Sequence, residues 1–337
     1  MEEKTTEVKF TFIDLFAGIG GFRLALEKSG GKCVFSSEID KHACEMYEVN
    51  YGENPYCDIT TADPHDIPDF DILCAGFPCQ SFSAAGKRKG FLDETRGTLF
   101  FEIVRILNVK KPKAFILENV QNLEKHDGGK TLNIILKSLR EIGYHVDYAI
   151  LNSKDFGVPQ NRERIILVGN LCGIEFEFSR IQKNPCASMK DFLDKNEDFV
   201  YLEPSEYTMI AKEYVKVQPK SGLIFVGYRN KNTRKNGIRE GTKYLSRTHK
   251  QPNRIYSYEG THPTLSAQEM SGRYFIFDGE GVRKLTITEC YRFMGFPESF
   301  KRVGSISQQY KRIGNSICVP MVEAVSKEVI RQIIERS

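Results

Sequence analysis

The sequence predicts an α/β protein in which a mainly parallel sheet is covered by helices on both faces and joined to a smaller, irregular lobe. Two observations predict this. In the first half of the 337-residue chain, short apolar runs alternate with helix-like stretches, as in parallel strands connected by helices. From about residue 186 to residue 282 this periodicity weakens, and Asn, Arg, Lys and Gly dominate. Such a composition indicates exposed loops.

The predicted strands are the apolar runs at 10–16, 32–36, 71–75, 113–118 and 165–169, and the predicted helices lie at 21–29, 42–50, 98–108 and 129–142. Apolar periodicity returns at 285–294 and 319–334, which predicts two more helices. Thr286 and Glu289 have the spacing of a capping box at the start of the first of these. The last helix is expected to pack on the first lobe. The predicted domains are 1–185 completed by 312–337, a second domain at 186–282, and a hinge segment at 283–311.

Composition is ordinary for a globular protein, with 40% hydrophobic and 27% charged residues. The longest apolar stretches are far shorter than the roughly 20 residues that span a bilayer. The amino terminus is acidic and lacks the apolar core of a signal peptide. We therefore expect no membrane association and a location in the cytoplasm, at the nucleoid.

The nine cysteines form no Cys-x-x-Cys pair and do not cluster with the six histidines. Neither a metal site nor a disulfide framework is predicted, and the thiols are expected to be reduced. The net charge of +4 is unevenly distributed. Residues 229–254 carry +8, which leaves −4 for the remainder, because Glu240 alone opposes Arg229, Lys231, Arg234, Lys235, Arg239, Lys243, Arg247, Lys250 and Arg254.

A glycine-rich turn follows the first predicted strand. The strand at 12–16 leads into Ala17-Gly18-Ile19-Gly20-Gly21, where glycines let a ligand approach the backbone at the carboxyl edge of the sheet. Glu38 lies 20 residues beyond Gly18, where an acid can hold ribose hydroxyls. A dinucleotide-binding oxidoreductase would need glycine at position 23, which is Arg23. A ligand with ribose and adenine but no pyrophosphate, such as S-adenosylmethionine, fits this turn better.

Cys79 is the candidate nucleophile. It follows the apolar run at 72–75, and the loop that it begins carries Lys87, Arg88, Lys89 and Arg96. Cationic surroundings favour the thiolate, which is the reactive form. The alternative is a small buried cysteine, as expected for Cys74 inside the strand.

Polar residues that suit Cys79 follow later in the chain. Glu118 ends the strand at 114–117, at the edge where α/β sheets bind ligands, and can donate a proton or a hydrogen bond there. Gln160, Arg162 and Arg164 alternate before the strand at 165–168, and a period of two predicts that they share one face. Two guanidiniums on one face attract an anion or a carbonyl oxygen. The alternatives are a capping or ion-paired glutamate and surface arginines on an edge strand.

The order of these motifs resembles the DNA cytosine-5 methyltransferase family, most closely the small bacterial HhaI-type enzymes of restriction-modification systems. The resemblance covers nearly everything outside the basic lobe. The motifs are DLFAGIGGF at 14–22, GFPCQSFS at 76–83, RGTLFF at 96–101, ENV at 118–120, QNRERI at 160–165, RKLTITECYRFMGFP at 283–297 and GNS at 314–316.

The resemblance implies a Rossmann-like S-adenosylmethionine-dependent methyltransferase sheet and catalytic roles for four residues. Cys79 would be the nucleophile, Glu118 would protonate or hydrogen-bond N3 and the exocyclic amine, and Arg164 would hold the ring carbonyl while Arg162 supports the loop. No metal is required, and S-adenosylhomocysteine is the product. The implied cofactor residues are Phe16, Gly18, Gly20, Glu38, Ile39, Asp58, Ile59, Pro78, Leu99 and Asn315. Ile39 replaces the tryptophan of close relatives, so the adenine is expected to pack on an aliphatic wall.

The resemblance also implies that residues 186–282 form a target-recognition domain for double-stranded DNA. A base inside a duplex cannot reach Cys79, so the cytosine must be flipped out, and Gln251 is the candidate to fill the gap. Close relatives have a serine where this chain has Ala85. The implied partners are DNA and a cognate restriction endonuclease that forms no stable complex with this chain, which is expected to be a monomer. The implied DNA-binding residues are Gln80, Lys87, Arg229, Gln251, Arg254, Tyr256 and Thr264.

Two alternatives share this catalytic lobe. A transfer-RNA cytosine methyltransferase typically carries Pro-Pro-Cys and Cys-Phe-Thr, whereas this chain has Phe77-Pro78-Cys79 and no such second tripeptide. A DNA-binding regulator on a decayed methyltransferase fold would have lost a catalytic group, but Cys79, Glu118 and Arg164 are all present. The sequence therefore favours a DNA methyltransferase.

Overall fold

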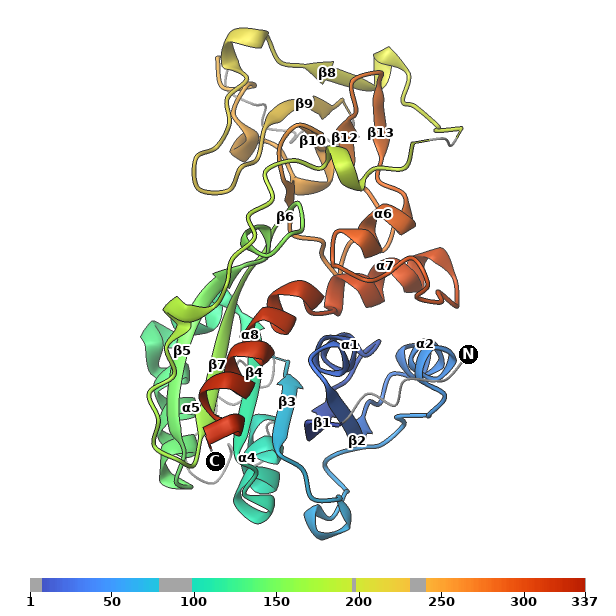
Figure 1. The fold of residues 1–337 in the computed structure, drawn as a ribbon. Coiled ribbons are helices and arrows are strands. Elements are labelled where there is room, and N and C mark those ends of the chain that lie inside the picture. Colours follow the sequence, from blue (N-terminus) through green and yellow to red (C-terminus); the bar gives the residue numbers. More distant parts are fainter. Residues whose placement is uncertain (1–7, 79–98, 196–197, 231–240, 337) are drawn as a thin grey trace. The chain divides into compact units, whose positions relative to one another are not determined.

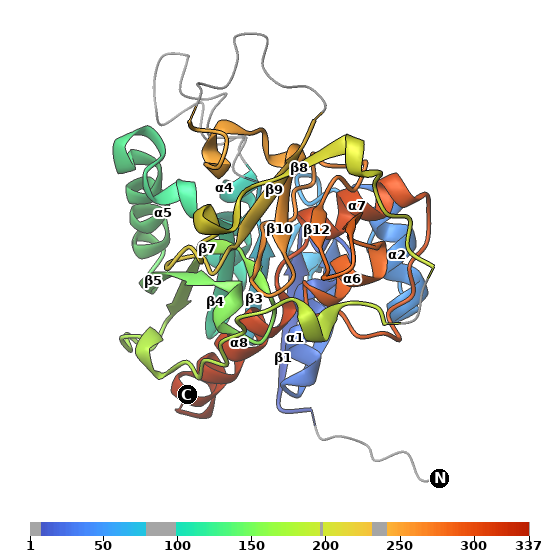
Figure 2. The same ribbon diagram turned by 90° about the horizontal axis from the view of Figure 1, so that it is seen from above.

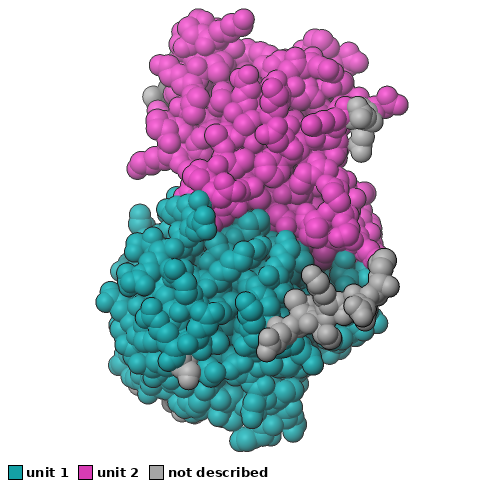
Figure 3. Space-filling model, in the orientation of Figure 1, with its two compact units in different colours: residues 1–152, 163–183, 317–337 teal, residues 153–162, 184–316 magenta. Residues whose placement is uncertain are grey.

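The structure is a computed structural model that describes residues 8–78, 99–195, 198–230 and 241–336. Contacts between residues divide the chain into two compact units (Figure 3). Unit 1 comprises residues 1–152, 163–183 and 317–337, and unit 2 comprises residues 153–162 and 184–316. Residues 283–311, expected to form a hinge, thus group with unit 2, as does the short segment 153–162.

Unit 1 is built on a sheet with the strand order β2-β1-β3-β4-β7-β5. Strands β1 (Phe10–Leu15), β2 (Gly31–Ser37), β3 (Ile72–Gly76) and β4 (Ala114–Val120) are parallel, and β7 (Glu163–Asn170) runs antiparallel to β4 and to β5 (His145–Asn152). Because both faces are covered, the central strands are buried almost throughout, as their continuous apolar runs predicted. The α/β fold class is confirmed.

Helices cover the two faces of this sheet (Figures 1 and 2). Helices α4 (Leu99–Lys110) and α5 (Lys130–Glu141) bury Ile103, Leu107 and Leu139 in the same core as Leu15 of β1. Helix α1 (Gly21–Lys28) packs against α8 (Val319–Gln332), where the hydroxyls of Ser29 and Ser326 are 2.9 Å apart. The prediction that the last helix packs on the first lobe is confirmed. Helix α2 (Lys41–Tyr51) begins after Asp40, whose side chain accepts hydrogen bonds from two backbone N–H groups.

Strand β5 was not predicted from the sequence. Val146 and Leu151 are buried, whereas Tyr148 is 40% exposed. As an edge strand, β5 mixes buried and exposed positions, and it therefore lacks the continuous apolar run that identified its neighbours.

Unit 2 contains a sheet with the order β13-β12-β10-β9-β8. These strands are short, and Val226, Ile255, Phe275 and Val282 form a small core among them. Their bounds are β8 Tyr207–Met209, β9 Phe225–Arg229, β10 Arg254–Ser257, β12 Phe275–Phe277 and β13 Val282–Lys284, and a separate pair joins β6 (Gln160–Asn161) to β11 (His262–Pro263).

The described part of unit 2 also contains two α-helices. Helix α6 (Ile287–Arg292) begins with the predicted capping box, in which Thr286 and Glu289 each bind the backbone N–H of the other. Helix α7 (Ile306–Asn315) was not predicted, because its buried face includes the polar side chains Gln309 and Arg312. No helix in the described parts of the chain is both long enough and apolar enough to cross a membrane.

Candidate active site

The candidate site of unit 1 lies at the carboxyl edge of its sheet, where β1, β3 and β4 all end. Strand β2 lies on one side of β1, and the next strand in the sequence, β3, lies on the other side. The strand order therefore reverses at β1. Open α/β sheets bind ligands at such a switch point. The predicted cofactor turn follows β1, Cys79 follows β3 in the sequence, and Glu118 lies on β4.

The turn after β1 has an unusual backbone. Phe16 adopts a φ of 57°, which is uncommon for a bulky residue. Gly18 and Gly20 also have positive φ, 57° and 81°. A Cβ on Gly20 would lie 2.3 Å from Cε2 of Tyr51, whereas nothing lies within 4 Å of a Cβ on Gly18. Glycine is therefore required at position 20 by both backbone and space, and at position 18 it leaves the backbone open to a ligand.

Glu38 holds this turn through its carboxylate. Oε2 accepts a hydrogen bond from Gly18 N–H at 2.8 Å, and Oε1 accepts from the N–H groups of Ile39 and Asp40 at 2.9 and 2.8 Å. A carboxylate has about four acceptor positions, so it can accept a further bond from a ribose hydroxyl. The apolar side chain of Ile39 is 62% exposed beside it. The carboxylate of Glu38 could bind a ribose, and the side chain of Ile39 could pack on an adenine. Both groups are present in S-adenosylmethionine.

The remaining predicted cofactor residues differ in exposure. Asp58 is exposed, and hydrogen bonds from the hydroxyl and the backbone N–H of Thr60 lower its pKa. Ile59 is buried, Leu99 is half-buried and Pro78 is exposed. Asn315, at the end of α7, is exposed and belongs to unit 2, whereas the others belong to unit 1.

Glu118 and Arg164 meet in unit 1. Glu118 lies beside Gly76 of β3 in the sheet register, and Arg164 lies on β7 beside Val120. Arg164 Nε is 2.9 Å from Glu118 Oε1, and the two side chains are 11% and 10% exposed. The Nε–H does not point at that oxygen closely enough for a hydrogen bond, so the contact is mainly electrostatic. The structure thus brings together a predicted acid and a predicted guanidinium.

Asn119 fixes the backbone that leads to the candidate nucleophile. Its Nδ2 donates to the carbonyl of Phe77 at 2.8 Å, and its Oδ1 accepts from Val120 N–H at 2.8 Å. The side chain is 2% exposed. The end of β3 is therefore bonded to the end of β4 two residues before Cys79. Cys79 itself, with Gln80, Ala85 and Lys87, lies outside the described residues.

The period-two argument predicted that Gln160, Arg162 and Arg164 share one anion-binding face, but only Arg164 belongs to β7 of unit 1. Gln160 and Arg162 belong to unit 2. The buried guanidinium of Arg162 donates to the carbonyls of Leu265, Gly314 and Ser316 at 3.0, 3.3 and 2.6 Å. Gln160 binds Leu265 N–H and the carbonyl of Phe293. Arg162 therefore holds loops together, because its two terminal nitrogens already serve backbone carbonyls.

The described part of the basic segment divides into exposed and engaged side chains. Lys243, Arg247 and Lys250 are exposed. Arg229 is 12% exposed, lies 3.2 Å from Glu206 Oε1 and stacks on the Phe275 ring at 4.7 Å. The neighbouring carboxylate and ring make Arg229 a support of the sheet.

The other predicted DNA-binding residues also lie in unit 2. Gln251 is exposed, and its Oε1 accepts a hydrogen bond from Arg254 Nη1 at 2.7 Å. Thr264 Oγ1 donates to the carbonyl of Asn161 at 2.8 Å. Tyr256 is only 2% exposed, which favours a packing role over contact with DNA.

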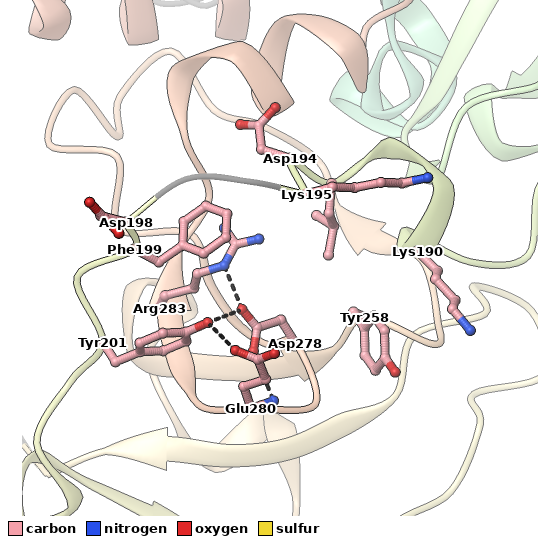
Figure 4. Close-up of a pocket in the computed structure, with 11 residues that line it drawn as sticks. Lys190, Asp194, Lys195, Asp198, Phe199, Tyr201, Tyr258, Asp278, Glu280 and Arg283 are labelled. Carbon is pink, nitrogen blue, oxygen red and sulfur yellow. Dashed lines mark hydrogen bonds and ion pairs between the residues drawn. The ribbon is translucent and has the colours of Figure 1, made fainter.

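A pocket of about 510 Å³ in unit 2 contains none of the predicted site residues (Figure 4). Several of its polar groups, namely Arg283, Asp278, Glu280 and Tyr201, bind one another. Arg283 Nε lies 2.6 Å from Asp278 Oδ2, and Arg283 Nη2 lies 2.9 Å from Oε1 of Glu289. The hydroxyl of Tyr201 donates to Asp278 and Glu280. This pairing indicates a structural network.

Asp14 is a buried group in unit 1 that the sequence reasoning assigned no role. It is 0% exposed, and neither carboxyl oxygen has a hydrogen-bond partner among the described residues. Burial raises its pKa to about 8, although the nearby backbone N–H and guanidinium of Arg23 favour the charged form to a lesser degree. The signal in the sequence was an acid inside an apolar strand.

This burial predicts a pH dependence for Asp14→Asn. Between the ordinary pKa of 3.8 and the folded value of about 8, the folded protein keeps a proton that the unfolded chain has lost. The wild type should therefore lose stability as the pH rises from about 4 to about 8, by an amount on the order of a few kcal/mol. Asn cannot lose a proton. The melting temperature of the variant minus that of the wild type should therefore increase by several degrees from pH 5 to pH 8. A constant difference across that range, measured by thermal unfolding, would contradict the assignment.

Comparison with known proteins agrees with this geometry. The sequence matches the family described as C-5 cytosine-specific DNA methylase over residues 10–331. Type II methyltransferase M.NlaX of Neisseria lactamica is 41% identical over 332 residues, which cover 95% of this chain and 96% of that protein. Type II methyltransferase M.HhaI of Haemophilus parahaemolyticus is 41% identical, with 94% of this chain and 93% of that protein covered.

A solved structure shows the same fold. The S. pombe Dnmt2 methyltransferase has a TM-score of 0.68 and 22% identity, and the match covers 96% of this chain and 98% of that one. The family match spans most of the sequence, and the curated relatives align over nearly their whole length. The chain therefore belongs to the C-5 cytosine-specific DNA methylase family and is a DNA cytosine-5 methyltransferase.

Proposed function

We propose that this enzyme is the modification methyltransferase of a type II restriction-modification system. It transfers methyl groups from S-adenosylmethionine to carbon 5 of a flipped-out cytosine in a specific DNA sequence, through a covalent adduct with Cys79. The observation that carries the proposal is the Glu118–Arg164 contact of 2.9 Å at the sheet edge where β3 leads to Cys79. The relatives' names supply the restriction-modification role. The enzyme acts as a cytoplasmic, nucleoid-associated monomer, and the cognate endonuclease acts separately.

In the proposed reaction the thiolate of Cys79 forms a bond to carbon 6 of the cytosine ring. Carbon 6 is a poor electrophile, so the electron density displaced by this attack must be drawn towards N3. Glu118 donates a proton or hydrogen bond there, and Arg164, held against Glu118, binds the ring carbonyl. S-adenosylmethionine supplies an electrophilic methyl group for carbon 5. Methyl transfer leaves S-adenosylhomocysteine. Water then takes the carbon 5 proton, the electron pair of that C–H bond restores the double bond, the sulfur–carbon 6 bond breaks to release the Cys79 thiolate, and any proton given to N3 returns to Glu118.

The cofactor is proposed to lie at the carboxyl edge of β1 and β2. Glu38 would bind the ribose hydroxyls, the open backbone at Gly18 would admit the ligand, and Ile39 would pack on the adenine. Asp58 has a second carboxylate oxygen available for the adenine amine.

Two assays on the wild-type protein test the proposed function. Bisulfite sequencing of plasmid DNA from cells that express the chain should show methylation at one cytosine of one recurring sequence. DNA with 5-fluorocytosine at that position should form a complex with the enzyme that survives denaturation, because fluorine cannot leave as a proton does. Methylation without a trapped complex would contradict the covalent route, and no methylation at any site would contradict the function.

The base-flipping part of the proposal predicts a role for Gln251. Flipping a cytosine costs a few kcal/mol, and a side chain that fills the vacated space offsets part of this cost. Gln251→Ala should lower the fluorescence of 2-aminopurine at the target position severalfold, because less of the base is flipped.

Gln308→Ala is a matched control for Gln251→Ala. Gln308 Oε1 accepts a hydrogen bond from Arg312 at 3.0 Å, as Gln251 Oε1 does from Arg254 at 2.7 Å. The control should leave the fluorescence unchanged. Equal signals from both variants would remove Gln251 from the flipping step.

A further inference from the structure

The carbonyl of Gly20 links the cofactor turn to two helices. It accepts a hydrogen bond from Leu24 N–H at 2.9 Å, in the first turn of α1. It accepts a second one, at 2.7 Å, from the hydroxyl of Tyr51, the last residue of α2. The Tyr51 ring occupies the space that a Cβ on Gly20 would need, with Cε2 at 2.3 Å from that position. Tyr51 therefore both packs on the turn and hydrogen-bonds to it.

Arg23 fixes the ring of Tyr51. Its guanidinium carbon lies 4.6 Å from the ring centre, a distance at which the cation is attracted to the ring face. The guanidinium also donates to the hydroxyl of Tyr47 at 3.1 Å and to carboxylates of Glu27 and Glu53 at 2.7 and 3.0 Å. Arg23 is 7% exposed, so this arrangement leaves it little freedom. Position 23, where a dinucleotide fold has its third glycine, here carries a cross-link between α1 and α2.

The same turn is held at its other end by the residue proposed to bind ribose. Gly18 N–H donates to Glu38, which lies just before α2, while Gly20 accepts from Tyr51, which ends α2. Movement of the turn away from Tyr51 would therefore alter the contact between Gly18 and Glu38. The two hydrogen bonds, at 2.8 and 2.7 Å, flank Ile19.

We propose that Tyr51, supported by Arg23, is a positioning residue for the methyl-donor site. It holds the glycine turn in the conformation in which Gly18 and Glu38 meet, so that the site is formed before the cofactor arrives. The inference rests on the proposed use of S-adenosylmethionine. Tyr51 touches neither cofactor nor substrate and acts through the Gly20 carbonyl.

Tyr51→Phe tests the proposal because it keeps the ring and removes only the hydroxyl. The Kd for S-adenosylmethionine, measured by calorimetry without DNA, should rise roughly threefold to tenfold, the equivalent of one hydrogen bond. The KM for S-adenosylmethionine should rise by a similar factor, while kcat and the KM for DNA stay unchanged. Arg23→Lys, which keeps the charge but loses the planar fork, should raise the Kd in the same direction.

Tyr144→Phe is the matched control. Tyr144 is a buried tyrosine of unit 1 whose hydroxyl donates to the carbonyl of Pro112 at 2.9 Å. It should lower the melting temperature about as much as Tyr51→Phe does and leave the Kd for S-adenosylmethionine unchanged. If Tyr51→Phe also leaves the Kd unchanged, the hydroxyl is only structural. The inference is then overturned, while the proposed use of S-adenosylmethionine is not affected. If the wild type binds no S-adenosylmethionine, the proposed cofactor use is overturned and this inference with it.

Discussion

Cys79→Ser is expected to lower the rate of methyl transfer roughly a thousandfold or more, and to abolish the covalent complex with 5-fluorocytosine DNA. A hydroxyl is far less acidic than a thiol, so serine supplies almost no anionic nucleophile near neutral pH. The substitution changes a single atom, and the anchor that leads to it remains, because Asn119 holds the Phe77 carbonyl through its own side chain. DNA and cofactor affinity should therefore stay within a few fold of wild type.

The measurement is tritium transfer from labelled S-adenosylmethionine, together with the denaturing-gel assay for the trapped complex. Cys172→Ser is the control, since Cys172 is an exposed thiol of the same unit and the substitution is chemically identical. It should leave both readouts unchanged. A trapped complex formed by Cys79→Ser would assign the nucleophile to another residue.

The central sheet could be predicted from the sequence because of how its strands are buried. β1, β3 and β4 lie between two layers of helices, so their sequences are apolar at successive positions and are easily recognised. β5 and α7 could not be recognised in this way. β5 alternates irregularly at the edge of the sheet, and α7 buries polar side chains that contact neighbouring loops.

The predicted face shared by Gln160, Arg162 and Arg164 rested on the assumption of one continuous strand. The structure instead has β6 at Gln160–Asn161 paired with β11, and β7 from Glu163 paired with β4 and β5. The strands belong to different sheets, and a period of two does not extend from one to the other. Arg162, between them, binds the carbonyls of Leu265, Gly314 and Ser316.

The contacts of Tyr51 and Arg23 show a second limit. Tyr51 and Gly20 are 31 positions apart, and Arg23 and Glu53 are 30 apart. Local patterns carry no information about such pairs, because each residue fits an ordinary helix by itself. By contrast, Glu38 could be anticipated, since the distance from a glycine turn to the end of the next strand is set by one helix and two short connections.

Glu118→Gln is expected to lower kcat about a hundredfold to ten-thousandfold, the usual effect of losing a positioned proton donor. Glutamine keeps the size of the side chain and can still occupy the space beside Gly76. It loses the transferable proton and the negative charge that faces Arg164 Nε at 2.9 Å. The guanidinium of Arg164 would then lose its carboxylate partner at a site where its side chain is 11% exposed. Removal of one partner from such a pair is costly, so a fall in stability should accompany the loss of rate.

Glu328→Gln separates these two effects. Glu328 of α8 accepts hydrogen bonds from Arg331 at 2.7 Å and from Gln332 at 2.7 Å, and it is 7% exposed. Its substitution also removes a buried carboxylate from an arginine, although the Arg331 side chain is 58% exposed. It should leave kcat within about twofold of wild type, because Glu328 lies on α8 and not on β1, β3 or β4. If single-turnover rates fall equally in both variants, the loss in Glu118→Gln reflects stability, and proton donation by Glu118 is contradicted. If only Glu118→Gln is slow while its DNA affinity is retained, the missing proton at N3 limits the attack of Cys79 on the ring.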